Sequence, residues 1–278
     1  TNYCVRNCTY CGIRALNKNA ERYRLTIDEI LECAELGDRL GYKTYVLQGG
    51  EDPYFTDDVM VYIISKIKKH FPENAITISL GERSYESYKK MFEAGADRYL
   101  IRHETATKEL YEKLHPGASF ENRRKCLENL KEIGYQIGSG FMIGLPGQKN
   151  SDLVNDLLYV KELNPHMVGI GPFISHKDTP LKDEKNGTLE DTINLIALLR
   201  LLLPSALIPA TTSLGTINPL GRELGIKAGA NVVMPNLSPT SVRKKYSLYD
   251  GKICTGDEAA ECRNCIEGRI NRAGFKVE

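Results

Sequence analysis

The fold of this chain is decided by a short stretch that begins with Thr26-Ile27-Asp28-Glu29. Gly41 follows it, and then Thr44-Tyr45-Val46-Leu47-Gln48. Thr26 and Glu29 have the spacing of a capping box, which predicts that a helix begins here. Its apolar residues recur at helical spacing until Gly41, a residue type that commonly ends helices. The residues from Thr44 to Gln48 are typical of a strand. Together they predict one helix–strand unit.

The same unit recurs along the chain. Further strands are predicted at residues 75–80, 98–105, 136–145, 167–171, 206–212 and 231–235, each after a helical pattern. We expect one more strand in an N-terminal segment ahead of Thr1 that is missing from the sequence. Alternating strands and helices form parallel βαβ units, and eight of them predict an α/β fold of the (β/α)8 TIM-barrel type. Its active site would lie at the carboxyl ends of the strands, and a doubly wound open sheet is the alternative.

Composition excludes several classes of partner. The 278 residues include 37 basic and 36 acidic side chains, and a net charge of +1 does not favour nucleic acid or a membrane surface. The most apolar run, residues 193–203, is too short to span a bilayer. We expect no export signal, so the eight cysteines do not indicate a disulfide framework and a reducing, cytoplasmic location is expected. No linker interrupts the pattern, which predicts one domain: a barrel over residues 1–245 and a short C-terminal appendage at 246–278.

Three cysteines lie close together in Cys4-Val5-Arg6-Asn7-Cys8-Thr9-Tyr10-Cys11. Thiolates are soft ligands that suit iron–sulfur clusters and zinc, and three of them leave one metal position open. A zinc loop completed by a distant histidine is one interpretation. With an aromatic residue before the third cysteine, however, the loop resembles the C-x3-C-x2-C motif of radical S-adenosylmethionine (radical SAM) enzymes. That resemblance implies a [4Fe–4S] cluster on Cys4, Cys8 and Cys11 that binds SAM and delivers the electron that cleaves it.

The predicted strand at 98–105 is the most informative about a binding cavity. Alternation places Arg98, Arg102 and Glu104 on one face and the apolar residues on the other, so the charged set faces the barrel interior. Gln48 and Thr77 face inward by the same rule. Buried charges are costly unless they are paired or bind a ligand. A polar cavity for an anionic substrate is favoured, and a structural ion-pair layer is the alternative.

From Cys4 to Cys265 the chain resembles the HydE family of radical SAM [FeFe]-hydrogenase maturases. The resemblance is specific where Arg102-His103-Glu104-Thr105 combines with Pro209-Ala210-Thr211-Thr212. The residues that it implies for SAM binding are Tyr10, Gly50, Glu51, Ser79, Glu104, Arg123 and Met142. The residues that it implies for the substrate cavity are Gln48, Thr77, Arg98, Arg102, Thr211, Thr212 and Met234.

The resemblance also implies a reaction and partners. The reduced cluster would cleave SAM to a 5′-deoxyadenosyl radical, which acts on a cysteine-ligated iron carbonyl cyanide precursor during assembly of the hydrogenase diiron site. The partners would be a donor maturase, a scaffold maturase and an electron donor. No catalytic side chain is predicted beyond the cluster and SAM.

The end of the chain holds a second group of cysteines, Cys254-x7-Cys262-x2-Cys265, whose spacing predicts a second metal site. The resemblance implies an accessory [2Fe–2S] or [4Fe–4S] cluster there, without a catalytic role. Two other functions remain open: a related radical SAM enzyme of the methylornithine synthase or biotin synthase kind, and a non-catalytic iron–sulfur scaffold. Cleavage of SAM would separate the scaffold from the enzymes.

Overall fold

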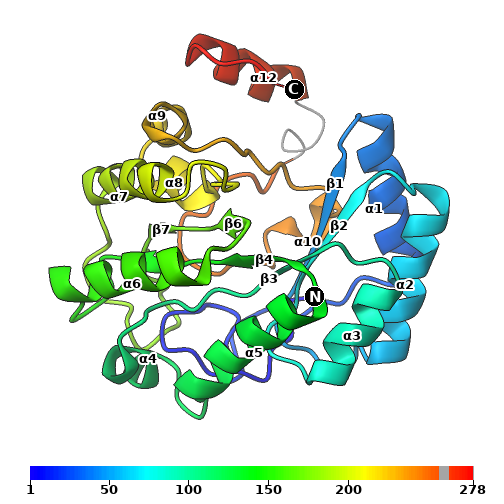
Figure 1. Cartoon of the computed structure of the whole chain (residues 1–278), viewed down its shortest axis with the longest axis horizontal. Coiled ribbons are helices and arrows are strands. Elements are labelled where there is room, and N and C mark those ends of the chain that lie inside the picture. The colour runs from blue at the N-terminus through cyan, green and yellow to red at the C-terminus, as the bar shows by residue number, and fades with distance from the viewer. Residues whose placement is uncertain (257–262, 278) are drawn as a thin grey trace.

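The computed structural model describes residues 1–256 and 263–277, without the side chains of residues 264 and 265. Helices and strands alternate along most of it (Figure 1). In chain order these elements are α1 (Ile27–Arg39), β1 (Thr44–Gln48), α2 (Asp57–His70), β2 (Ala75–Ser79), α3 (Tyr85–Glu93), β3 (Arg98–Leu100), α4 (Lys108–Leu114), α5 (Phe120–Ile133), β4 (Gln136–Ser139), β5 (Met142–Ile143), α6 (Asn150–Leu163), β6 (Met167–Val168), β7 (Gly171–Pro172), α7 (Leu189–Leu202), α8 (Thr212–Ile217), α9 (Gly221–Ala228), α10 (Thr240–Arg243) and α12 (Arg263–Arg272).

The first helix–strand unit forms as its sequence predicts. The backbone N–H of Glu29 donates to Thr26 Oγ1 at 3.2 Å, and the Glu29 carboxylate accepts from the backbone N–H of Thr26 at 2.7 Å. This reciprocal pair is a capping box. Gly41 follows the helix with φ +78°, a conformation that glycine adopts without strain. Strand β1 then has the predicted bounds.

All strand pairs are parallel, and neighbours in the sheet follow the order of the sequence. The main sheet has the order β1-β2-β3-β4-β6, while β5 and β7 extend β4 and β6 as a second pair. Isolated bridges from Met167 to Leu207 and from Pro209 to Val232 continue the sequence order. A doubly wound sheet reverses its order at one point, and this sheet does not. Helices α1, α2, α3, α5, α6 and α7 follow one another around the strands (Figure 1), which confirms the barrel type of fold.

Several strands are shorter than predicted, for identifiable reasons. The segment 98–105 is a strand only at Arg98–Leu100, followed by an isolated bridge from Glu104, whose backbone is left-handed with φ +65°, to Phe141. The segment 136–145 divides into β4 and β5 around Gly140. A Cβ atom at Gly140 would collide with the carbonyl oxygen of Gly169, so these two backbone segments approach each other as closely as glycine allows. The interruptions lie at the carboxyl ends of the strands, where the candidate site is found.

The outward face of β3 packs under the helices, as the alternation predicts. Tyr99 is fully buried, with its ring 4.9 Å from that of Tyr88 on α3 and 5.8 Å from that of Tyr135. These residues belong to a core cluster shared by β1 to β4 and the helices outside them. A second cluster lies beneath α6, α7 and α9. The helices therefore hold the strand ends at fixed positions.

The segment predicted as a C-terminal appendage, together with Lys245 just before it, returns to the start of the chain. The carbonyl of Lys245 accepts from Asn2 Nδ2 at 2.7 Å, and the carbonyl of Leu248 accepts from the backbone N–H of Gly12 at 2.9 Å. Farther on, Arg269 on α12 forms an ion pair with Glu223 on α9 at 2.7 Å. The residues from 245 to 248 therefore lie against the cysteine loop.

Candidate active site

The cysteine loop, residues 4–11, lies across the carboxyl ends of the first strands. Its backbone is tied to three separate segments: Val5 N–H donates to the carbonyl of Glu51, Thr9 N–H to that of Leu114, and Gly12 N–H to that of Leu248. Gly50, just after β1, is buried against the loop, and a Cβ there would lie 2.7 Å from Cys4 Cβ. A glycine is needed for this approach. The fold therefore fixes the three cysteines next to the Gly50-Glu51 turn.

The thiols of Cys4, Cys8 and Cys11 are free and largely enclosed. Burial raises the pKa of Cys8 to about 12, although Arg123 partly opposes the shift, and burial also raises the pKa of Cys4 and of Cys11. Without a metal these groups are therefore neutral at pH 7, whereas a coordinated thiol is deprotonated.

The donor set fits an iron–sulfur cluster better than a single ion. Within the described ranges, no three Cys, His, Asp or Glu side chains surround one point as ready ligands for a metal ion. A cluster has several metal corners, so its thiolate ligands do not need to converge on one atom. Three soft thiols with no closing fourth ligand in the same loop match that requirement.

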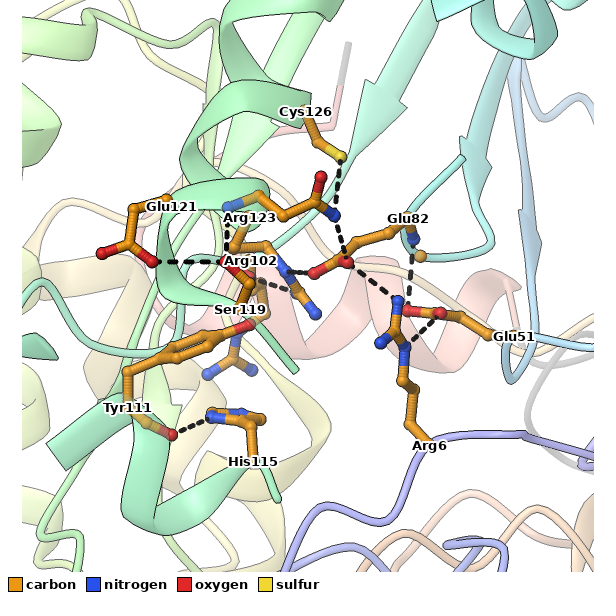
Figure 2. Close-up of polar contacts among 12 residues, drawn as sticks. Arg6, Glu51, Glu82, Arg102, Tyr111, His115, Ser119, Glu121, Arg123 and Cys126 are labelled. Carbon is orange, nitrogen blue, oxygen red and sulfur yellow. Dashed lines mark hydrogen bonds and ion pairs between the residues drawn. The ribbon is translucent and has the colours of Figure 1, made fainter. Parts of the chain in front are cut away.

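A partly buried network of charges connects the cysteine loop to the ends of β1 and β2 (Figure 2). Arg6, inside the loop, binds Glu51 at 2.5 Å and Glu82 at 2.8 Å. Glu82 also accepts from Arg123 Nε at 2.7 Å, and the other arm of Arg123 donates to the carbonyl of Arg102 at 2.8 Å. Burial alone would raise the pKa of Glu82, but Arg123 and Arg6 hold it below its usual value. The negative charges of Glu51 and Glu82 thus balance the positive charges of Arg6 and Arg123 around the loop.

The inward face of β2 and of the segment that follows β3 carries polar atoms that have no hydrogen-bond partner. Among the described residues these buried atoms include Thr77 Oγ1, Glu104 Oε2, and Nε and Nη2 of Arg102. Arg102 Nη2 lies 2.9 Å from Glu104 Oε2, an ion pair without good hydrogen-bond geometry. Buried polar groups are rarely left unpartnered, so this face is suited to a polar ligand.

Glu104 is held in a strained conformation at the mouth of the barrel. Its φ of +65° is uncommon for a residue other than glycine, asparagine or aspartate. Hydrogen bonds fix it on both sides: its N–H donates to the carbonyl of Gly140 at 3.0 Å, and its carbonyl accepts from Met142 N–H at 3.2 Å. Such strain persists where the surroundings impose it, and it concentrates at functional sites.

Tyr10 has a partner that sequence reasoning missed. Its hydroxyl and His115 Nε2 are 2.8 Å apart, and His115 stacks on Tyr111 with ring centroids 4.2 Å apart. Burial lowers the pKa of His115 to about 4, so the ring is neutral at pH 7. His115 Nδ1 donates to the carbonyl of Tyr111 at 2.7 Å, and Nε2 therefore accepts from Tyr10. The aromatic residue of the cysteine motif is thus anchored to α4.

The other residues predicted for SAM lie at the same end of the barrel. Ser79 is half-buried at the end of β2, where its carbonyl accepts from Gly49 N–H at 3.1 Å. Met142 is buried in a small apolar cluster against which Tyr10 packs. The structure therefore gathers Tyr10, Gly50, Glu51, Ser79, Glu104, Arg123 and Met142 around the cysteine loop or the strand ends beside it.

The residues predicted for the substrate are more dispersed. Thr77 and Arg102 belong to the inward polar face, and Gln48 ends β1 beside Tyr246. Arg98 lies at the other end of the barrel, because it is bonded to Gln136 at 2.8 Å and to Thr44 at 3.3 Å, the first residues of β4 and β1. Along a strand, four residues span about 13 Å, so Arg98 is far from Arg102.

The last three substrate residues come from later elements. Thr211 Oγ1 and Ser213 Oγ are 2.9 Å apart, and Thr212 Oγ1 lies 3.4 Å from Arg222 Nη2. Met234 is exposed after the bridge at Val232. A cavity of about 540 Å³ lies nearby, lined by the loop before α7, the first residue of α7, the last two residues of α8, and Asp250 and Gly251, and it includes none of the predicted site residues.

In the second group, the structure describes Cys254 with its side chain and the backbone of Cys265, which lies on α12. Arg222 Nη2 donates to Cys254 Sγ at 3.0 Å, and Cys254 has a left-handed backbone with φ +63°. Cys262 and the side chain of Cys265 lie outside the described residues.

Sequence reasoning missed Arg6, Glu82 and His115. One signal could have found Glu82: Gly50-Glu51 after β1 is matched by Gly81-Glu82 after β2, so the same dipeptide follows both strands. Their carboxylates meet Arg6 from two sides. No local pattern marks His115, whose partner Tyr10 is 105 residues away in the sequence.

The chain is similar to several known proteins. The profile of the radical SAM superfamily matches residues 1–160. The [FeFe] hydrogenase maturase subunit HydE of Thermotoga maritima is 53% identical over 276 residues, which cover 99% of this chain and 79% of that protein. The 3-methylornithine synthase of Methanosarcina acetivorans is 33% identical over 250 residues, 89% of this chain and 70% of that one. The crystal structure of methylornithine synthase (PylB) superposes with a TM-score of 0.83 at 29% identity, covering 100% of this chain and 80% of that one.

One negative observation concerns membranes. Within residues 1–256 and 263–277, no helix has both the length and the apolar character that crossing a membrane requires.

Proposed function

Because the chain belongs to the radical SAM superfamily and, within it, to the HydE family of [FeFe]-hydrogenase maturases, we propose that it modifies an organometallic precursor of the hydrogenase diiron site. The chain is a radical SAM enzyme, and its family implies a [4Fe–4S] cluster and SAM as cofactors. The observation that carries the proposal is the 53% identity to the HydE subunit over 99% of the chain.

Cys4, Cys8 and Cys11 would hold the cluster, whose bound SAM supplies a 5′-deoxyadenosyl radical. The protein's own part is to position SAM. Arg123 is buried and charged, since Tyr111 and Glu82 raise its pKa although burial opposes the charge. A SAM carboxylate would compete with Glu82 for this guanidinium. Glu104 would accept from the ribose hydroxyls or the amino group, and Tyr10, Gly50, Glu51, Ser79 and Met142 would line the remainder of SAM.

The substrate would be a cysteine-ligated iron carbonyl cyanide complex. Cyanide and carboxylate groups accept hydrogen bonds, and Arg102 and Thr77 offer buried donors that have no hydrogen-bond partner in the described structure. Gln48, Thr211, Thr212 and Met234 would complete the cavity wall. Arg98, at the opposite end of the barrel, would act on the part of the substrate farthest from SAM, or on its entry.

Two further assignments follow the family. Cys254, Cys262 and Cys265 would hold an accessory [2Fe–2S] or [4Fe–4S] cluster. The other hydrogenase maturases would supply the precursor and receive the product, and an electron donor would reduce the first cluster.

The test is an anaerobic assay of the reconstituted protein with SAM and dithionite. 5′-Deoxyadenosine is quantified with and without the cysteine-ligated iron carbonyl cyanide complex. We expect slow release of 5′-deoxyadenosine without the complex, and an adenosylated sulfur species in its place when the complex is present.

The alternatives give different results. Cleavage of SAM that the complex does not change would point to another radical SAM reaction, for which methylornithine formation is the next assay because of the 33% identity to that synthase. A fully loaded cluster that cleaves no SAM would contradict the proposal and favour a scaffold.

A further inference from the structure

The cysteine loop has an outer surface to which the proposed chemistry assigns no role. Large apolar side chains are exposed on the loop and beside it: Val5 by 58%, Leu16 by 64% and Tyr54 by 57%. Val5 and Leu16 are close in space, because the carbonyl of Arg6 accepts from the backbone N–H of Ala15 at 2.8 Å. Single exposed apolar residues are common, but a group beside one loop suggests a contact surface.

A cation and two aromatic rings extend this surface. The Arg24 guanidinium lies 3.8 Å from the centroid of the Tyr3 ring and 4.9 Å from that of Tyr54, and Asp52 fixes it at 2.7 Å. The three side chains are therefore held in place before any partner binds. Tyrosine and arginine are enriched in the centres of protein interfaces, where such preorganisation lowers the entropic cost of binding. We call Tyr3, Val5, Leu16, Lys18, Arg24 and Tyr54 the loop face.

The charge of this part of the chain is distinct from that of the whole. Residues 1–25 contain five basic side chains and one acidic one, whereas the whole chain has 37 and 36. Arg6 is paired with Glu51 and Glu82, and Arg24 with Asp52. The other three basic residues have no carboxylate within 4.0 Å among the described residues: Arg14, Lys18 and Arg22. The one acid, Glu21, is already paired with Lys245 at 2.5 Å. Lys18 is exposed, and among the described residues it has no carboxylate within 4.0 Å. The loop face is thus apolar and basic, which complements an acidic protein.

We propose that the loop face is the docking surface of an acidic one-electron carrier protein. The inference rests on the proposed function, since reductive cleavage of SAM needs one electron per turnover. Val5 and Tyr3 adjoin Cys4, so a carrier on this face would have its redox centre close to the cluster. In the complex, the carrier's reduced centre loses one electron and the cluster gains it. No bond forms or breaks.

The test uses the reconstituted protein and a reduced acidic [4Fe–4S] ferredoxin as the probe. The variant combines Leu16→Asp with Lys18→Glu. The matched control combines Leu201→Asp with Lys227→Glu, because Leu201 is 78% exposed on α7 and Lys227 is exposed on α9. The first readout is the ferredoxin affinity by calorimetry at low and high salt. The second is 5′-deoxyadenosine formation driven by ferredoxin or by dithionite.

We expect the loop-face variant to bind ferredoxin at least about fivefold more weakly and to lose most of the salt dependence. The rate of 5′-deoxyadenosine formation that dithionite drives in this variant should stay within about twofold of the wild type. In the control variant, the ferredoxin affinity and both rates of 5′-deoxyadenosine formation should also stay within about twofold. Equal affinities of the variant and the control, whether weakened or not, would overturn the docking surface. Failure of dithionite to drive SAM cleavage in the wild type would instead contradict the proposed function, while the calorimetry would still decide the docking surface.

Discussion

Glu82 is the residue on which the charge network around the cysteine loop depends. Its carboxylate is buried and accepts from Arg6 at 2.8 Å, Arg123 at 2.7 Å and Asn122 at 2.7 Å. If the carboxylate were lost, Arg6 would keep Glu51 as an ion-pair partner, but Arg123 would have no carboxylate within 4.0 Å among the described residues. Removing one partner of a buried ion pair is strongly destabilising because the other charge remains uncompensated. Glu82 should therefore contribute both to stability and to the position of Arg123.

We expect Glu82→Gln to lower the free energy of unfolding by about 3 kcal/mol at pH 7. The lowered pKa of Glu82 sets the pH dependence. A carboxyl whose pKa is lowered by folding stabilises the fold at every pH above its pKa in the unfolded chain, which is about 4.3. This stabilisation is lost as the pH falls through the lower pKa that the carboxyl has in the folded protein. The difference between wild type and variant should therefore be largest near neutral pH and vanish in acid.

Urea unfolding of the cluster-free protein between pH 3 and pH 7 measures this difference. Glu128→Gln is the matched control, because Glu128 is an exposed partner of Lys125 at 3.3 Å and should change stability by less than about 0.5 kcal/mol. A Glu82→Gln effect no larger than that of the control would show that the network does not stabilise the fold.

Arg102 and Arg98 share one face of β3 and its continuation but should have separable effects. Arg102→Leu leaves Glu104, 2.9 Å from the guanidinium, without its cationic partner. We expect this change to slow SAM cleavage without substrate by about tenfold or more. Arg98→Leu removes a group bonded only to Gln136 and Thr44 in the described structure, so substrate-free cleavage should persist. Its effect should be on the KM for the iron complex. Equal losses of substrate-free cleavage in both variants would refute the separation.

At the scale of elements, the close contact between Gly140 and Gly169 shapes the mouth of the barrel. Gly140 lies between β4 and β5, and its carbonyl accepts from Glu104 N–H at 3.0 Å. A Cβ would collide with the Gly169 carbonyl at 1.9 Å, so the strands would have to separate. Because Glu104 is held by this segment, separation should also release its strained backbone.

We therefore expect Gly140→Ala to destabilise the protein by about 3 kcal/mol, at the upper end for overpacking. Gly117→Ala is the control: Gly117 has φ +77°, but nothing lies within 4 Å of its Cβ position. Gly117→Ala should lower the free energy of unfolding by only about 1 kcal/mol, which is the cost of a left-handed backbone at alanine. Urea midpoints compare the two. If the two variants lose the same stability, backbone conformation rather than contact with Gly169 accounts for Gly140.

At the scale of the whole molecule, the sequence predicts features that depend on neighbouring residues, but it does not predict contacts between residues far apart in the chain. Helix caps, strand alternation and the C-x3-C-x2-C spacing are local, so the barrel class and the faces of β3 are correct. The depth of Arg98 in the barrel depends on register, which pairs it with Gln136 at the start of β4. Arg6 is 45 and 76 residues from its partners Glu51 and Glu82 in the sequence, and Tyr10 is 105 residues from His115. Such pairs can be identified only from the folded structure, in which the strand ends lie close together.

Cys8 and Cys254, one from each group of cysteines, lie on different parts of the barrel, so their roles can be tested separately. Cys8 belongs to the loop across the carboxyl ends of β1 and β2, whereas Cys254 is bonded to Arg222 on α9. We expect Cys254→Ala to lose part of the bound iron and to keep most of the rate of 5′-deoxyadenosine formation. Cys8→Ala should abolish that product while it retains iron at the tail. Iron analysis, Mössbauer spectra and the anaerobic SAM assay decide between these outcomes. If Cys254→Ala removed iron and SAM cleavage together, the second group would belong to the catalytic site, and the accessory assignment would be wrong.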